Sequence, residues 1–210
     1  MKTDRLCRAL GTTLDVAEWR HATAILESDF PHEWQDMVNV LSALEFSQRE
    51  GVQRKASSIK EWDRLRDEFY GKGWRKWQFY TRLVVDTSRL ESPTHEVTCL
   101  KGRVAMEVEW NSVGHRYDRH LNNFRALFDL RAISVGVVVT RSDDPQNQSR
   151  GSHGTGMEDN PSARFGKLVR LMNGASSGGC PVLAIGIKAP TFVEAPRVLQ
   201  AKGVVKGARH

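Results

Sequence analysis

Two short, continuous runs of apolar residues constrain the fold of this 210-residue chain more than any other feature. They cover residues 133–139 and 181–187. A strand that is apolar on both of its faces is typical of the centre of a parallel sheet that helices cover on both sides. Neither run approaches the roughly 20 apolar residues that a membrane-spanning helix needs. The sequence therefore predicts a sheet with these two strands at its centre and no membrane span.

The periodicity of the other apolar residues predicts the remaining elements. Helical spacing indicates four helices, over residues 33–48, 58–69, 118–131 and 165–172. β-branched and aromatic residues indicate strands over residues 77–85, 95–100 and 103–110. The last two strands read as a hairpin with Lys101 and Gly102 at its turn. This order predicts an α/β or α+β sheet covered on both faces, within one domain over residues 1–210.

Positive charge is concentrated in part of the chain. Lys and Arg number 31 against 25 Asp and Glu, and the formal net charge is +6. Residues 49–82 hold ten basic and five acidic side chains, and residues 197–210 add four basic ones in a tail that we expect to fray. This balance favours a partner that carries phosphates. The chain shows no signal-peptide pattern and its three cysteines form no Cys-x-x-Cys pair, so we expect a cytoplasmic protein with reduced thiols.

The strand predicted over residues 103–110 has the pattern most relevant to chemistry. Alternate side chains of a strand share a face, so one face carries core residues and the other carries Glu107 and Glu109. The core set is Val104, Met106, Val108 and Trp110. At about 6.6 to 6.8 Å along the strand, two carboxylates can hold one or two hard cations against a phosphate oxygen. The alternative interpretation is a half-exposed strand whose outer face carries glutamates.

A two-residue turn at Lys101 and Gly102 would fix which residues of the two strands face each other. The pairs would be Leu100 with Arg103, Cys99 with Val104, Thr98 with Ala105, and Glu96 with Glu107. Glu96 and Thr98 then share the face of the two glutamates. Because like charges opposite each other destabilise a sheet, this register favours either a bound cation or a different pairing.

Three other patterns are interpreted as structural. The histidines at positions 95, 115 and 120 lack the spacing of a helical metal pair, which indicates surface or core histidines. Residues 151–156 are rich in glycine but lack a P-loop ending, which indicates a flexible loop. Residues 73–80 interleave basic and aromatic side chains, as platforms for single-stranded nucleic acid do. A strand that enters a core gives the same pattern, and we prefer the core interpretation for this segment.

Several segments together resemble one known family. They are residues 94–95, the run Lys101-Gly-Arg-Val-Ala-Met-Glu-Val-Glu-Trp-Asn111, and residues 118–119, 123–125, 133–141 and 179–183. This set resembles the BglII/BstYI group of type II restriction endonucleases, with its BstYI members nearest. The resemblance is dense over residues 92–142, returns at residues 165–187 and is thin before residue 70.

The resemblance implies a homodimeric enzyme that cuts both strands of a short palindrome in double-stranded DNA, with Mg²⁺ at each active site. The implied fold class is α/β, a restriction-endonuclease-like mixed central sheet flanked by helices, of the PD-(D/E)XK type. Glu107 matches the family's metal-binding acidic residue on the second hairpin strand. Glu109 matches a position that carries Glu or Gln in this group, and it would orient or deprotonate the attacking water or hold a second metal.

Thr98 departs from the family pattern. The first acidic ligand of the family, an Asp nine residues before the Glu, falls on Thr98. A neutral hydroxyl in place of a carboxylate should weaken both metal affinity and transition-state stabilisation. Glu96 could substitute for it as a metal ligand. A catalytically weakened or inactive DNA-binding relative is therefore one alternative, and a nuclease with a repair or junction-cutting role is another.

Base-reading side chains are expected in the polar segment over residues 142–163, which is too long for an idle loop in a compact domain. Its DNA-binding candidates, chosen for their groove-edge chemistry, are Asn147, Gln148, Ser149, Arg150, Ser152 and His153. Family membership would suggest a GATC-centred recognition site.

Overall fold

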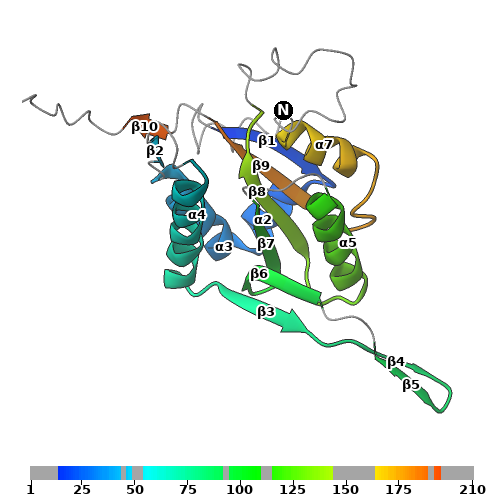
Figure 1. Ribbon diagram of the computed structural model, residues 1–210. Coiled ribbons are helices and arrows are strands. Elements are labelled where there is room, and N and C mark those ends of the chain that lie inside the picture. Colours follow the sequence, from blue (N-terminus) through cyan, green and yellow to red (C-terminus); the bar gives the residue numbers. More distant parts are fainter. Residues whose placement is uncertain are drawn as a thin grey trace, which may run out of the picture.

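A six-stranded mixed sheet forms the centre of the molecule (Figure 1). The computed structural model describes residues 14–43, 46–48, 54–91, 95–109, 115–143, 164–188 and 192–194. In spatial order the sheet consists of β1 (Leu14–Trp19), β9 (Val182–Ile187), β8 (Val135–Arg141), β7 (Val104–Glu109), β6 (His95–Lys101) and β3 (Arg75–Phe79). Strands β7, β8 and β9 are parallel to one another. The other three pair with their neighbours in antiparallel orientation, so the sheet is mixed, as predicted.

The two apolar runs form the centre of this sheet, which confirms the prediction from their composition. Every residue of β9 is buried, and β8 is buried from Val135 to Thr140. Gly136 of β8 allows helix α5 (His115–Asp129) to approach closely, because a Cβ atom at this position would lie 2.3 Å from a ring carbon of Phe124. The missing side chain at Gly136 thus sets how near α5 comes to the sheet.

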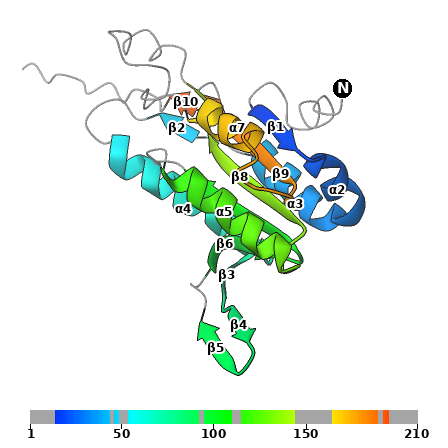
Figure 2. The same cartoon turned by 90° about the vertical axis from the view of Figure 1, so that its right-hand side faces the viewer.

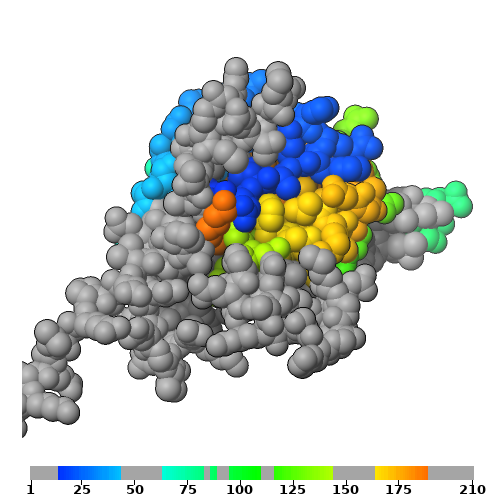
Figure 3. Space-filling view, turned by 90° about the horizontal axis from the view of Figure 1, so that it is seen from above, coloured from blue at the N-terminus to red at the C-terminus, as the bar shows by residue number. Residues whose placement is uncertain are grey.

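Helices cover both faces of the sheet. Helices α2 (Ala22–Asp29), α3 (Pro31–Ser42) and α4 (Arg54–Gly71) pack on one face, in a core that includes Leu26, Met37 and Phe69. Helices α5 and α7 (Phe165–Asn173) pack on the other face, where Phe124 and Leu168 are buried. Figures 1 and 2 show α5 and α7 together on this face, and Figure 3 shows α7 beside β1. The α/β class with flanking helices is therefore confirmed.

Several element boundaries differ from the predicted ones. The helix predicted over residues 33–48 ends at Ser42, and residues 46–48 form strand β2 (Phe46–Gln48), which pairs in parallel with β10 (Phe192–Glu194). The helix predicted over residues 58–69 extends over Arg54–Gly71, because good helix formers precede its apolar stripe. Gly73, with a φ of 87°, terminates the turn that follows this helix.

The strand predicted over residues 77–85 is two strands. Strand β3 ends at Phe79, and β4 (Arg82–Val85) pairs instead with β5 (Ser88–Glu91), for which the sequence predicted no strand. Asp86 takes a φ of 52° in the turn between them, a left-handed conformation that Asp tolerates better than most residues. The resulting β4–β5 ribbon projects away from the sheet (Figures 1 and 2).

Some predictions concern residues outside the described part of the chain. They are the polar segment beyond Asp143, the basic tail at residues 197–210, and the core position of Trp110. In the described part, none of the helices has the length and apolar character that crossing a membrane requires.

Candidate active site

The two glutamates of β7 point to the same face of the sheet and are both buried. The side chains of Val104 and Met106 pack in the core under α2, α3 and α4, whereas Ala105 packs in the core under α5. Glu107 and Glu109 follow Ala105 on that second face and are only 3% and 7% exposed. The predicted alternation is thus confirmed, but a half-exposed strand is not what forms, because α5 covers the glutamate face.

Thr98 of β6 contacts Glu107 directly. Its hydroxyl donates a hydrogen bond to Glu107 Oε2 at 2.5 Å, and its backbone N–H donates to Glu107 Oε1 at 3.3 Å. Both carboxylate oxygens of Glu107 are therefore held by one residue of the neighbouring strand. Thr98 and Glu107 thus share one face of the sheet, as predicted, but Thr98 contacts Glu107 where the predicted register had put Glu96.

The register of this hairpin differs from the predicted one by two residues. Lys101 pairs with Val104 and Leu100 pairs with Ala105, so Gly102 and Arg103 form the turn. Gly102 takes a φ of 54°, which suits the turn. Lys101 stays in the strand because its ammonium group binds Asp36 Oδ2 of α3 at 2.7 Å and the Lys72 carbonyl oxygen at 2.9 Å. The predicted pairing of Glu96 with Glu107 is therefore wrong.

A β-bulge in β6 turns Glu96 away from the carboxylate pair. Strand β3 pairs Arg75 with Leu100 but Trp77 with Val97, so β6 has one extra residue between these two pairs. Val97 packs under α5, on the face that Thr98 also reaches, and the side chain of Glu96 leaves on the opposite face. There Glu96 is 46% exposed and forms an ion pair with Lys76 Nζ at 2.9 Å. The bulge is the physical reason why Glu96 does not join the site.

His120 of α5 completes the cluster of polar side chains. Its Nε2 lies 3.1 Å from Glu109 Oε2, its Nδ1 lies 3.8 Å from Glu107 Oε2, and its side chain is 15% exposed. Tyr117, one turn earlier, fixes the helix over the sheet through a buried contact of 2.6 Å between its hydroxyl and that of Thr140. The imidazole thus bridges the two carboxylates from above.

The sequence interpretation overlooked His120, which it assigned to surface or core histidines. A usable signal was present, because residue 120 is three positions after Tyr117 and four before Phe124, both on the buried stripe of the helix. A polar side chain in that stripe must face a polar group of the sheet. Arg116 adds a weaker contact, 3.5 Å from Glu109 Oε1, and its side chain is 68% exposed.

The environment of Glu107 raises the pKa of its carboxyl group. Burial is the main cause, since removal of water disfavours the charged form. The nearby imidazole of His120 and the hydrogen bonds from Thr98 act in the opposite direction, and the charge of Glu109 adds to the rise. A buried carboxylate with an unmet demand for positive charge is a group that a bound cation would stabilise.

The donor set of this site suits a hard divalent cation in kind. Two carboxylates and a hydroxyl supply oxygen atoms, the ligands that Mg²⁺ prefers. Among the described residues, no three His, Cys, Asp or Glu side chains are arranged to hold a metal ion. At this site Glu107, Glu109 and Thr98 would supply the oxygen ligands for such an ion.

The segment over residues 73–80 is only partly a core strand. Trp74 is buried, and its indole N–H donates to Asp36 Oδ2 at 3.0 Å. Trp77 and Tyr80, by contrast, are 40% and 77% exposed, so the core interpretation is wrong for these two aromatic residues. The reason is topological: β3 is an edge strand of the sheet.

The base-reading candidates Asn147, Gln148, Ser149, Arg150, Ser152 and His153 all lie outside the described residues. Their predicted role stays a prediction.

The chain matches a family model of known proteins. The family model for restriction endonuclease BglII/BglIII matches residues 14–187, which include the whole central sheet and all five helices of the described part. A search of curated proteins finds no match to the chain. The finer resemblance to BstYI stays a prediction.

Proposed function

Because the chain belongs to the BglII/BglIII restriction endonuclease family, we propose that it is a type II enzyme that uses Mg²⁺ to hydrolyse double-stranded DNA at a short palindromic, GATC-centred site. The observation that carries the catalytic part of this proposal is the buried pair Glu107 and Glu109, held by Thr98 from the next strand and by His120 from α5. Burying two carboxylates lowers the stability of the fold, and such buried groups are typical of functional sites. Metal-dependent hydrolysis of a phosphodiester is a function that requires them.

Each side chain has a distinct part in this mechanism. Mg²⁺, when bound, would neutralise charge on the scissile phosphate and its leaving oxygen. Glu107, oriented by its two hydrogen bonds from Thr98, would be the main ligand. Glu109 would orient the attacking water and accept its proton at a carboxylate oxygen. His120, 3.1 Å from Glu109 Oε2, would keep that carboxylate in a fixed orientation.

Palindrome cleavage also requires two sites related by a twofold axis. We propose a homodimer of about 47 kDa, twice the chain mass of 23.7 kDa. Its proposed location is the cytoplasm.

The second candidate function is DNA binding with weak or absent cleavage. Thr98 supports it, because a hydroxyl brings no charge to the position where the family has its first acidic ligand. Plasmid DNA incubated with the purified protein and Mg²⁺ or Mn²⁺ separates the two functions. Discrete fragments support the endonuclease, retardation without cutting supports the weakened relative, and nicking that depends on DNA structure supports a repair or junction role.

A matched pair of variants tests the catalytic assignment. We expect Glu107→Ala to lower the cleavage rate by about a hundredfold or more while DNA binding persists, since the group acts on the reacting phosphate. Glu68→Ala, on the exposed surface of α4, is the control and should cut like the wild type. Cleavage by Glu107→Ala at the wild-type rate would remove this residue from the mechanism.

A further inference from the structure

The edge strand β3 exposes aromatic and basic side chains that the catalytic site does not use. Strand β3 ends the sheet next to β6, and Trp77 on it is 40% exposed. Arg75 is also exposed, and its guanidinium lies 4.7 Å from the centre of the Trp77 ring. An exposed edge strand invites pairing with other chains unless charged side chains protect it, and Arg75 is such a charge on this strand.

The register puts this Arg–Trp pair on the same face of the sheet as the carboxylates. Arg75 is opposite Leu100 and Trp77 is opposite Val97, and residues that face each other across antiparallel strands project from the same side. Leu100 and Val97 both belong to the core under α5, the side on which Glu107 lies. Strand β3 is two strands away from β7, so it lies about 10 Å from the carboxylate strand at 4.7–4.9 Å per strand.

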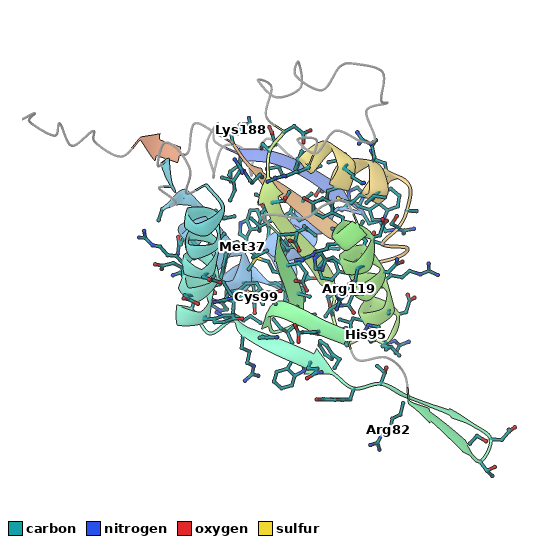
Figure 4. All side chains as sticks on the ribbon, viewed as in Figure 1. Met37, Arg82, His95, Cys99, Arg119 and Lys188 are labelled. Carbon is teal, nitrogen blue, oxygen red and sulfur yellow. The ribbon has the colours of Figure 1, made fainter. Side chains whose placement is uncertain are left out.

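The chain continues from this strand toward the β4–β5 ribbon with further exposed groups. Tyr80 is 77% exposed, and Arg82 is exposed where β4 begins. Figure 4 shows the side chain of Arg82 at the base of the ribbon, pointing away from the helices. Lys76, on the other face of β3, forms an ion pair with Glu96, whereas Arg75 and Arg82 are both exposed.

We propose that Arg75, Trp77 and Arg82 bind the sugar–phosphate backbone of duplex DNA outside the base pairs that the enzyme reads. The proposal rests on the proposed function. Both guanidinium groups are exposed at this edge of the sheet, and the phosphates of duplex DNA carry the opposite charge. A guanidinium stacked on an indole is held in one orientation, so it loses little entropy when it binds a phosphate. Phosphate contacts of this kind position a protein on DNA without reading sequence.

The test measures binding to a 40-base-pair duplex of random sequence, without divalent cations so that no cutting occurs. Affinity is measured by fluorescence anisotropy over a range of salt concentrations. We expect Arg75→Ala and Arg82→Ala each to weaken binding by roughly tenfold and to reduce the slope of log K against log salt by about one. Trp77→Ala should weaken binding less, because it removes only the support of Arg75.

Arg20→Ala is the matched control. Arg20 lies over the ring of Trp19 at 5.6 Å, but it follows β1, at the opposite edge of the same sheet. The Arg20→Ala variant removes the same charge and the same kind of stacking as Arg75→Ala. Because Arg20 is far from β3, this variant should leave both the affinity and the salt slope near wild-type values.

The outcomes separate this inference from the proposed function. A wild-type protein that does not bind the duplex would overturn this inference, whereas only the plasmid-cleavage test would overturn the proposed function. A wild-type protein that binds, with Arg75→Ala and Arg82→Ala no weaker than Arg20→Ala, would overturn only the role of β3. If the β3 variants left DNA binding intact but changed the mass in sedimentation, the edge would be covered by a second copy of the chain, which also overturns the inference.

Discussion

Replacing Thr98 by Asp tests whether this position belongs to a metal site. The substitution introduces, next to Glu107, the carboxylate that the family resemblance implies at this position. The Thr98 hydroxyl donates a hydrogen bond to Glu107 at 2.5 Å. Without a metal, the carboxylate that takes its place would repel the Glu107 carboxylate. With Mg²⁺, the two carboxylates would hold the ion better than one does. The variant should therefore be less stable than the wild type without Mg²⁺ and regain stability with it.

The contact distance sets the size of this effect. An aspartate at position 98 has its charge within about 4 Å of the Glu107 carboxylate, where two like charges repel by about 4 kcal/mol at an effective dielectric constant of 20. Uptake of a proton by one carboxylate limits the loss to less than this. Mg²⁺ at a hundred times its Kd returns about 2.7 kcal/mol. A domain of this size shifts its Tm by about 2 to 4 °C per kcal/mol, so Mg²⁺ should raise the Tm of the variant by about 5 to 10 °C.

Thermal unfolding with and without Mg²⁺ measures the effect, and Thr98→Asn is the control. Asn has the shape of Asp without its charge, so it reports the loss of the hydroxyl alone. Cleavage by Thr98→Asp should also need less Mg²⁺ than cleavage by the wild type. Equal Tm values for the Asp and Asn variants, with and without Mg²⁺, would place position 98 outside the metal site. Glu96→Gln should change neither measurement, and a severe effect of this variant would restore Glu96 as a ligand.

Three further predictions follow from the packing and the charges. Because the pKa of Glu107 is raised, the folded protein holds the carboxyl proton more tightly than the unfolded chain does, and the free energy of unfolding falls as pH rises from the ordinary carboxyl pKa through the raised one. Glu107→Gln should flatten this pH dependence and raise the denaturation midpoint at neutral pH. An unchanged midpoint would contradict the prediction. Gly136→Ala should cost about 1 to 3 kcal/mol in urea unfolding, because its Cβ would lie 2.3 Å from Phe124; a neutral result would mean that α5 shifts freely. Burial raises the pKa of the Cys99 and Cys180 thiols to about 12, so iodoacetamide at pH 8 should label neither until the protein unfolds, and mass spectrometry of the native protein checks this.

The sequence was sufficient for the parts of the fold that depend on local periodicity. The two apolar runs became β8 and β9 because a strand that is apolar on both faces has no stable place except the centre of a covered sheet. The alternation over β7 put Glu107 and Glu109 on one face for the same kind of reason, the two-residue period of a strand.

The pairing of the hairpin depended on contacts that the local sequence does not contain. Lys101 remains in β6 because Asp36, 65 residues earlier, binds its ammonium group. The bulge in β6 lies opposite β3. The sequence predicted that this strand continues to residue 85, whereas it ends at Phe79. These two features decide which of Thr98 and Glu96 reaches Glu107, so the site could be predicted only to within that choice.

The conflict between β7 and its surroundings is the strongest physical argument that this strand has a function beyond the fold. A strand between β6 and β8, with helices on both faces, should read as nearly continuous apolar residues, as β9 does. Glu107 and Glu109 break that rule at buried positions, where apolar side chains of similar volume are often neutral or more stable by about 1 to 4 kcal/mol. Thr98 and His120 reduce this cost without removing it, since the pKa of Glu107 remains raised. Buried carboxylates that do not contribute to the stability of the fold are typical of functional sites. Here they indicate a site that acts on a charged substrate.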